Sequence, residues 1–152
     1  MGYYLQAFIC RQGDINVLVD NFENAIEVVI GQGLTIVPMT ENLFNEMNNF
    51  SVSKTIDKFE LLTEEIEKKI IIHTNNKKIA YVEAEYFGGE GGQMAICWEN
   101  LKRQQFLNFA QDRINQVLKD FGVVAQIGKD EFDTLGFGRY RFTNEWIENN
   151  KE

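Results

Sequence analysis

The stretch from Lys77 to Asn100 constrains the fold of this chain more than any other. It consists of two apolar runs joined by a loop of glycines, with a single glutamate, Glu90, at the tip of the loop. Two strand-like runs around a glycine-bearing loop are typical of a β-hairpin. We therefore expect an antiparallel hairpin at this position, with the rest of the chain organised around it.

Alternation along the first strand of this hairpin, Lys78 to Phe87, sorts its side chains onto two faces. One face receives Ala80, Val82, Ala84 and Tyr86, and the other receives Ile79, Tyr81, Glu83, Glu85 and Phe87. A hairpin that pivots at Glu90 places Glu83 opposite Cys97 and Glu85 opposite Ala95, with an apolar face built from Ala84 opposite Ile96 and Val82 opposite Trp98. Two carboxylates on one face suit acid-base chemistry or cation binding. A solvated sheet face with incidental glutamates is the alternative.

The loop Gly88–Gly92 follows a strand, as phosphate-binding loops do. It lacks the Gly-Lys-Ser/Thr ending of a P-loop, and its glutamate repels phosphate, so a nucleotide site is not expected. Two interpretations stay open. The glycines form a turn that needs positive φ angles, or the loop, with Glu90, is a recognition loop that lets a partner approach closely.

A third cluster, Asp130 to Arg141, places acidic residues before two glycines and two arginines. Arg139 and Arg141 are candidates for bidentate pairs with carboxylates of this segment or with Glu83 and Glu85, and a partner-facing site is the alternative. The only histidine, His73, is expected on the apolar face of a helix. With two distant cysteines it forms no zinc-binding set, and we predict no metal and no cofactor.

The first half of the chain predicts alternating short elements. Tyr3 to Cys10 is expected to be a strand covered on both sides, and Asp14 to cap a short helix that ends near Phe22. Ala25 to Met39 predicts a second hairpin, whose second strand lies at an edge or stops at Pro38 because proline has no N–H. A helix over residues 24–30 is the alternative to its first strand.

Two threonines predict helix starts in the middle of the chain. Thr40 is expected to cap a helix ending near residues 48–49, and Thr63 a second helix that includes Ile70, although the run Ile70–Ile72 also suits a strand. Residues 50–59 are left unassigned.

The second half predicts one long amphipathic helix, because its apolar residues recur at helical spacing: Leu107, Ala110, Ile114, Val117, Leu118 and Phe121. Gly122 is expected to end that helix in a left-handed conformation. A short strand over Val123 to Ile127 and a last helix, capped by Thr143 and burying Trp146, complete the prediction.

Length and composition favour one domain spanning residues 1–152. The 152 residues suffice for one core, 44% of them are apolar, and neither a repeat nor a proline-rich linker divides the chain. Short strands and helices around antiparallel hairpins indicate a single α+β domain with a largely antiparallel sheet.

Charge and targeting signals limit the classes of partner. The net charge of -8 disfavours nucleic acid and anionic membranes and is compatible with a basic protein partner. Neither a signal peptide nor a membrane-spanning apolar run is recognised, so a cytoplasmic protein is expected. Cys10 and Cys97 lie in strand-like segments and are expected to be buried, free thiols.

Three segments together resemble a family of small bacterial cytosolic proteins of uncharacterised function: AYVEAEYFGGEGGQMAICW, INQVLKDFGV and DEFDTLGFGRYRFTNEW. The resemblance covers Ala80 to Trp146 and extends more loosely to IGQGLTIVPMTENLF. It implies a setting similar to that of stand-alone proteins, some of which act as immunity proteins against bacterial toxins. It carries over no catalytic residues.

The favoured hypothesis is a non-enzymatic, immunity-like protein-binding domain that uses an acidic surface and the glycine-rich hairpin tip. Its candidate binding residues are Glu83, Glu85, Glu90, Arg139 and Arg141. The alternative is a small hydrolase or ligand-binding enzyme that uses Glu83 and Glu85 with Arg139 or Arg141. The oligomeric state is left open.

Overall fold

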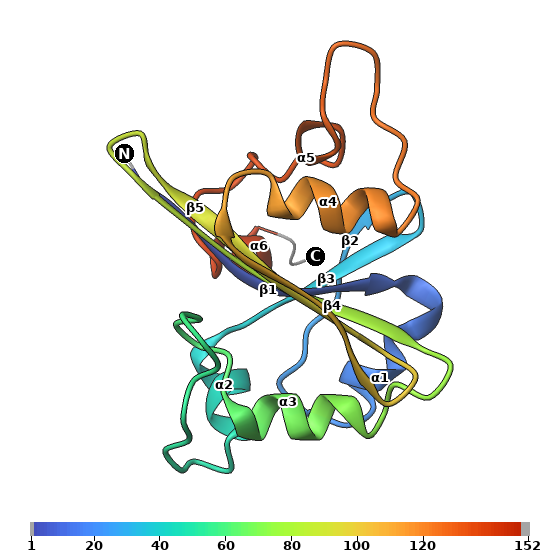
Figure 1. Cartoon of the computed structure of the whole chain (residues 1–152), viewed down its shortest axis with the longest axis vertical. Coiled ribbons are helices and arrows are strands. Elements are labelled where there is room, and N and C mark those ends of the chain that lie inside the picture. Colours follow the sequence, from blue (N-terminus) through green and yellow to red (C-terminus); the bar gives the residue numbers. More distant parts are fainter. Residues whose placement is uncertain (1, 150–152) are drawn as a thin grey trace.

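A computed structural model describes residues 2–149, which form a three-layer α+β fold around one antiparallel sheet (Figure 1). The six strands lie in the order β2-β3-β1-β4-β5-β6, so β1 and β4 are the two central strands. Their bounds are Tyr3–Arg11 (β1), Val28–Gly31 (β2), Leu34–Pro38 (β3), Lys78–Phe87 (β4), Glu90–Glu99 (β5) and Lys102–Ala110 (β6). The predicted fold class is confirmed.

Helices cover both faces of the sheet (Figure 1). One face, here called the α3 face, packs against α1 (Asn16–Val19), α2 (Glu41–Met47) and α3 (Glu64–Ile71). The opposite α4 face packs against α4 (Arg113–Asp120), α5 (Glu131–Thr134) and α6 (Glu145–Glu148). A 3-10 turn, Gln12–Asp14, precedes α1. The strands therefore bury apolar side chains on both faces, as the sequence of β1 predicted.

Alternate residues of the central strands feed the two cores. On β1, Leu5, Ala7 and Ile9 face the α4 side, whereas Phe8 and Cys10 face the α3 side. The α3-side core contains the fully buried rings of Tyr81 and Trp98, with Phe8 tilted against both. Because each core includes several of the largest side chains, burial on the two faces supplies most of the hydrophobic stabilisation.

Both threonine caps and both hairpins are confirmed. The hydroxyl of Thr40 accepts a hydrogen bond from the N–H of Leu43, and that of Thr63 accepts one from Ile66, each at 3.1 Å. Strand β3 ends at Pro38, and Gly122, at φ 92°, follows α4 in the left-handed region. A side-chain acceptor at the first turn satisfies a backbone donor that the helix leaves free.

Several local predictions are wrong. Asp14 does not cap α1. Its carboxylate instead accepts the N–H of Lys78. Thr143 does not cap α6, because its hydroxyl hydrogen-bonds Gln6 on β1. Residues 123–127 form no strand, and His73 lies just beyond α3 rather than on its apolar face. In each capping case a tertiary hydrogen bond takes the side chain away from the helix end.

The long helix predicted from Leu107 is also wrong at its start, because residues 102–110 form β6. At two places in its pairing with β5, strand β6 contains one residue more than β5 does. The first lies between the pairs Gln93↔Ala110 and Ala95↔Leu107, and the second between the pairs Cys97↔Gln105 and Trp98↔Arg103. Each extra residue is a β-bulge, and bulges are common on edge strands. They space Arg103, Phe106 and Phe109 three residues apart on the α3 face. The bulge opposite residues 93–95 likewise places Leu107 and Ala110, opposite Ala95 and Gln93, three residues apart on the α4 face, and this was the spacing that predicted a helix.

The central hairpin forms as predicted, but its register differs. Gly88 and Gly89 both have positive φ, 63° and 83°, and make a two-residue turn that pairs Phe87 with Glu90. Glu83 consequently lies opposite Met94 rather than Cys97, and Glu85 opposite Gly92 rather than Ala95. The two following glycines belong to β5 and not to the loop. The other two expected pairs shift in the same way, so Ala84 lies opposite Gln93 and Val82 opposite Ala95.

Cys10 and Cys97 are free and buried, as predicted. Burial raises the pKa of the Cys10 thiol to about 12 and that of Cys97 to about 11, so both thiols are protonated at neutral pH. No helix within residues 2–149 combines the length and the apolar character that a membrane crossing requires.

The hairpin register makes a prediction about Gly91. A Cβ at this residue, whose φ is 152°, would lie 1.8 Å from the carbonyl oxygen of Glu85, whereas a Cβ at Gly88 meets nothing within 4 Å. Gly91→Ala should therefore lower the free energy of unfolding by at least about 3 kcal/mol. The control Gly88→Ala should cost only the left-handed backbone conformation, about 1–2 kcal/mol. Equal losses in urea denaturation would contradict this register.

Candidate functional site

Strand β4 passes from a covered to an uncovered region on the α3 face. Ile79 and Tyr81 are completely buried, Glu83 is 9% exposed, and Glu85 and Phe87 are exposed. The connection between α2 and α3 crosses the α3 face of the sheet at residues 56–62, a segment we call the strap. The strap forms the border of the layer that covers this face, and it reaches the sheet at Glu83. The strap buries Ile56, Phe59 and Leu62 in the α3-side core. The two glutamates predicted to act together therefore lie in different environments.

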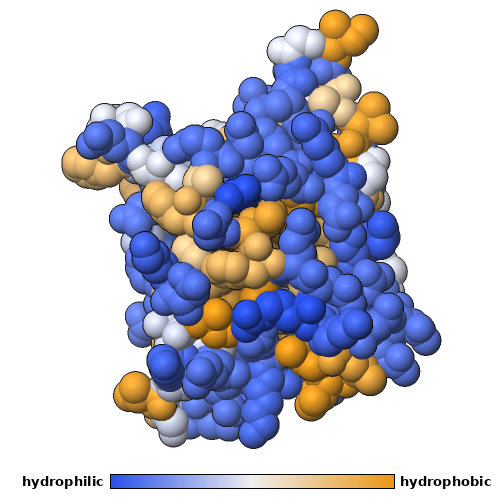
Figure 2. Space-filling view, viewed as in Figure 1, coloured by the Kyte–Doolittle hydropathy of each residue, from blue (hydrophilic) through white to orange (hydrophobic). Residues whose placement is uncertain are grey.

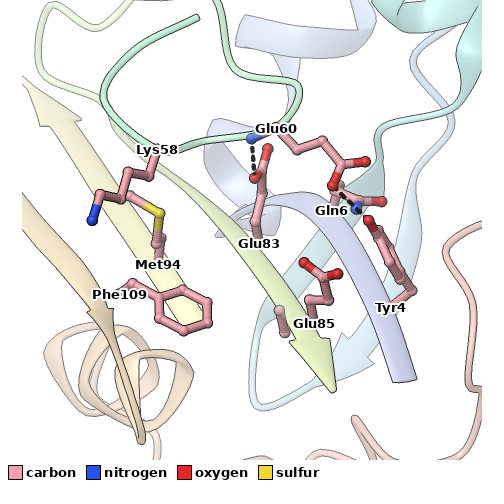
Figure 3. A pocket seen from close by; sticks show the side chains of 9 residues that line it. Tyr4, Gln6, Lys58, Glu60, Glu83, Glu85, Met94 and Phe109 are labelled. Carbon is pink, nitrogen blue, oxygen red and sulfur yellow. Dashed lines mark hydrogen bonds between the residues drawn. The ribbon is translucent and has the colours of Figure 1, made fainter. Parts of the chain in front are cut away.

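Glu83 anchors the strap to the sheet (Figure 3). Its two carboxylate oxygens accept hydrogen bonds from the N–H groups of Glu60, at 2.7 Å, and Leu61, at 2.9 Å. The hydroxyl of Tyr81 donates a third bond at 2.8 Å. A buried carboxylate with this many donors is satisfied, so Glu83 holds structure rather than standing free for chemistry.

Burial is the largest influence on the protonation of Glu83. It raises the pKa of this carboxyl above 4.5, although the hydrogen bonds from Glu60, Leu61 and Tyr81 favour the charged form; the nearby Glu60 carboxylate raises it further. The same surroundings raise the pKa of the buried Tyr81 hydroxyl, chiefly through burial.

Glu85, two residues on, borders a small cavity of about 60 Å³ that we call the acidic pocket. Figure 3 shows Glu83 and Glu85 between Tyr4 and Gln6 on one side and Met94 and Phe109 on the other. The Tyr4 hydroxyl donates to the Glu60 carboxylate, which raises the pKa of that hydroxyl. Of the residues in the described part of the chain, three with carboxyl groups (Glu60, Glu83 and Glu85) and one with a basic side chain (Lys58) line the pocket, so its charge favours a cation.

Phe109 reaches this pocket because of the bulges in β6. Its ring lies across Gly92 so closely that a Cβ on that glycine would be 2.7 Å from the ring. Gly92 pairs with Glu85, which places the ring beside the exposed carboxylate on the α3 face. Without a side chain at Gly92, an aromatic ring fills the space on the strand. Phe109 is nevertheless 51% exposed.

The hairpin tip continues the same surface. Phe87 is 78% exposed, and its direct partner, Glu90, is exposed on the same face. In Figure 1 the β4–β5 hairpin projects beyond the layer of α2 and α3, at the upper left of the view. We call the exposed side chains Glu85, Phe87, Glu90 and Phe109 the hairpin face.

The space-filling view shows where apolar side chains reach the surface. Apolar atoms are visible at the centre of the view, between the α4 layer and the α3 layer, and on the projecting tip at the upper left, and also on projecting segments at the upper right and the lower edge (Figure 2). Exposed apolar surface is therefore present at the hairpin tip, where Phe87 is exposed, and occurs elsewhere on the molecule too, as at Val124 and Ile127.

Arg139 and Arg141 lie away from the glutamates with which they were expected to pair. The Arg139 guanidinium lies over the ring of Trp146, 5.5 Å from its centroid, in the α4-side layer. The backbone of Arg141 donates to the Glu145 carboxylate, and its carbonyl accepts the N–H of Tyr4 at 2.6 Å. Within residues 2–149 neither arginine forms an ion pair. The geometry brings Glu83 and Glu85 together with Tyr4 and Glu60 instead.

Side chains that could hold a metal do not converge in the described part of the chain. No group of three or more His, Cys, Asp or Glu side chains within residues 2–149 is placed to bind one. His73 borders a separate hollow with Lys69 and Glu46. The arrangement around Glu83 and Glu85 suits binding through charge and aromatic contact.

Comparisons with known proteins give no match: no protein-family model, no curated protein and no solved structure matches the chain. The site must therefore be interpreted from its own geometry.

Sequence reasoning missed three residues of this site: Tyr4, Glu60 and Phe109. Tyr4 lies next to Glu85 through the pairing of β1 with β4, and Glu60 arrives with a strap that has no secondary structure. Both contacts join residues that are far apart in the chain, so no local pattern of the sequence predicts them. Phe109 had one, the i, i+3 spacing with Phe106, but this spacing also fits a helix.

The protonation of Glu83 predicts how stability depends on pH. A pKa raised in the folded state means that the folded protein binds the proton more tightly than the unfolded chain, whose glutamate has a pKa of 4.5. This contribution to stability is complete below about pH 4.5 and is lost as the pH rises through the folded-state pKa. The stability of the wild type relative to Glu83→Gln should therefore fall across that window.

Urea unfolding of both proteins from pH 4 to pH 8 measures the difference. A difference that is constant with pH, or that grows with rising pH, would contradict a buried carboxylate whose pKa is raised.

Proposed function

We propose that this chain is a non-enzymatic protein-binding domain whose hairpin face binds a basic protein partner. The observation that carries the proposal is the composition of that face. Two exposed carboxylates, Glu85 and Glu90, and the exposed ring of Phe87 lie on the projecting β4–β5 hairpin, and the exposed ring of Phe109, on the neighbouring strand β6, lies against Gly92 of that hairpin. Aromatic anchors surrounded by charge are common at the centres of protein interfaces.

The charges support a basic partner. Glu85 and Glu90 take part in none of the ion pairs found within residues 2–149, and the chain as a whole carries a net charge of -8. An acidic field accelerates encounter with a basic surface, and the two free carboxylates can orient it. Internal pairing does not compete for these two groups.

Rigidity of the hairpin also supports binding. Every residue of β4 pairs with β5, β1 pairs with β4 from Tyr3 to Cys10, and the aromatic ring of Phe109 is set against Gly92. A surface held in place before binding loses little conformational entropy on association. The glycines of the tip therefore serve the turn and the ring contact, while Phe87 and Glu90 present the contacts.

The class of partner that we propose is suggested by the resemblance of the sequence to a family of small bacterial cytosolic proteins. Proteins of that setting include immunity proteins, so a basic bacterial toxin is the partner that we propose to test first. A toxin gene beside the gene for this chain would support the assignment.

Substitutions in the hairpin face should weaken partner binding. The partner is obtained by affinity capture and cross-linking from cells that express the tagged chain, and its affinity is then measured with purified components. Phe87→Ala and the double charge reversal Glu85→Lys, Glu90→Lys should each weaken binding by at least about tenfold, or about 1.4 kcal/mol. The charge reversal should act mainly on the association rate and should matter less at high salt.

Phe50→Ala is the matched control, because Phe50 is 81% exposed and borders neither the acidic pocket nor the hairpin face. It should leave the affinity unchanged. A partner that binds wild type and hairpin variants equally would overturn the proposal.

A further inference from the structure

A second cavity lies on the other side of Tyr4 from the acidic pocket. It is a groove of about 510 Å³, larger than the acidic pocket, and the two share Tyr4 and Gln6. Its lining includes four apolar side chains, Met39, Phe44, Leu61 and Phe142, among polar residues from β1, α2 and the C-terminal segment. Its volume lies within the roughly 300–1,000 Å³ of protein sites that bury a ligand, enough for a large apolar side chain.

The walls of the groove are fixed by hydrogen bonds. The C-terminal segment lies along the start of β1, where the N–H of Tyr4 donates to the carbonyl of Arg141 and the N–H of Gln6 donates to Thr143, at 3.0 Å. Phe142, between these contacts, is held at the rim and is 50% exposed. The opposite wall is the first turn of α2, which Thr40 caps. The groove is therefore formed before any ligand binds.

Charge distinguishes which segment fits this groove. Glu41 lies at the groove, Glu60 contacts Tyr4 between the two cavities, and Glu85 lies beyond it. Among the residues of the described range 2–149 that line the two cavities, Lys58 is the single basic one. An apolar groove bordered by carboxylates complements an apolar side chain with positive charges beside it.

We infer that the groove receives an apolar side chain of a basic protein segment, whose neighbouring lysine or arginine lies over Tyr4 against Glu60 and Glu85. The segment continues from there to the hairpin face, since Glu85 both lines the acidic pocket and belongs to the hairpin face. This inference rests on the proposed function and adds to it the chemistry of the segment that the partner contributes: a large apolar residue within a run of basic ones.

A peptide titration tests the inference without the natural partner. The probe is a fluorescein-labelled peptide with one phenylalanine between pairs of lysines. Fluorescence anisotropy measures its binding to the full chain. Replacing the phenylalanine of the peptide by serine should weaken binding by at least about fivefold, and replacing its lysines by glutamates should abolish binding up to about 1 mM protein.

A double-mutant cycle locates the contact. Phe142→Ala should weaken the phenylalanine peptide by at least about fivefold and the serine peptide hardly at all, because only the first places a ring in the groove. Glu41→Lys should weaken both peptides, and Phe50→Ala should change neither. Absence of saturable binding, or equal losses for both peptides with Phe142→Ala, overturns the inference.

The captured partner separates this inference from the proposed function. If hairpin variants lose the partner and Phe142→Ala retains full affinity, the groove has no part in binding and the inference fails while the proposed function stands. If Phe142→Ala loses the partner and the hairpin variants do not, the assignment of the hairpin face fails. A small molecule that occupies the groove and leaves the affinity for the partner unchanged also counts against the inference.

Discussion

The hydrogen bonds between the Glu83 carboxylate and the strap determine where the covered part of the sheet ends. The central strands carry apolar side chains on both faces, so helices or loops must cover each face to keep these side chains from solvent. On the α3 face that layer stops at Glu83, which accepts two backbone N–H groups of residues 60 and 61. Beyond it on the α3 face, Glu85, Phe87 and Glu90 are exposed. The acidic pocket, the hairpin face and the groove are arranged around this boundary, with Tyr4 and Glu60 at their junction.

The sequence predicted the elements whose causes are local. The caps at Thr40 and Thr63, the left-handed Gly122 and the two hairpins depend on side chains and φ angles within a few residues. It failed where distant contacts decide. Thr143 binds Gln6 from the far end of the chain, and Arg139 is drawn to Trp146 rather than to a carboxylate. Strand β6 was mistaken for the start of a helix because a bulge places Leu107 and Ala110 on one face of the strand three residues apart, a spacing that is typical of a helix. Of the site, Glu83, Glu85 and Glu90 were found, but the residues that complete it were not.

The difference between Glu83 and Glu85 bears directly on function. Alternation placed both on one face, and this was sufficient to suggest a catalytic pair. Burial separates them: one is satisfied by three donors and the other is open to solvent. Glu83 supports the surface by holding the strap, whereas Glu85 is exposed and is the one of the two that the proposed function assigns to partner contact. The bulges and glycines of β5 and β6 have a related role, since they bring Phe109 to the same place.

Hydrogen–deuterium exchange can show whether the exposed end of the α3 face is the surface at which a partner binds. Exchange is measured on the chain alone and in complex with the captured partner. We expect binding to slow the exchange of backbone amides in the strap, in the β4–β5 turn and in β6 near Phe109, and to leave exchange in the connection between α4 and α5 unchanged. Protection confined to the α4 face, with the hairpin and the strap exchanging as in the free chain, would contradict it.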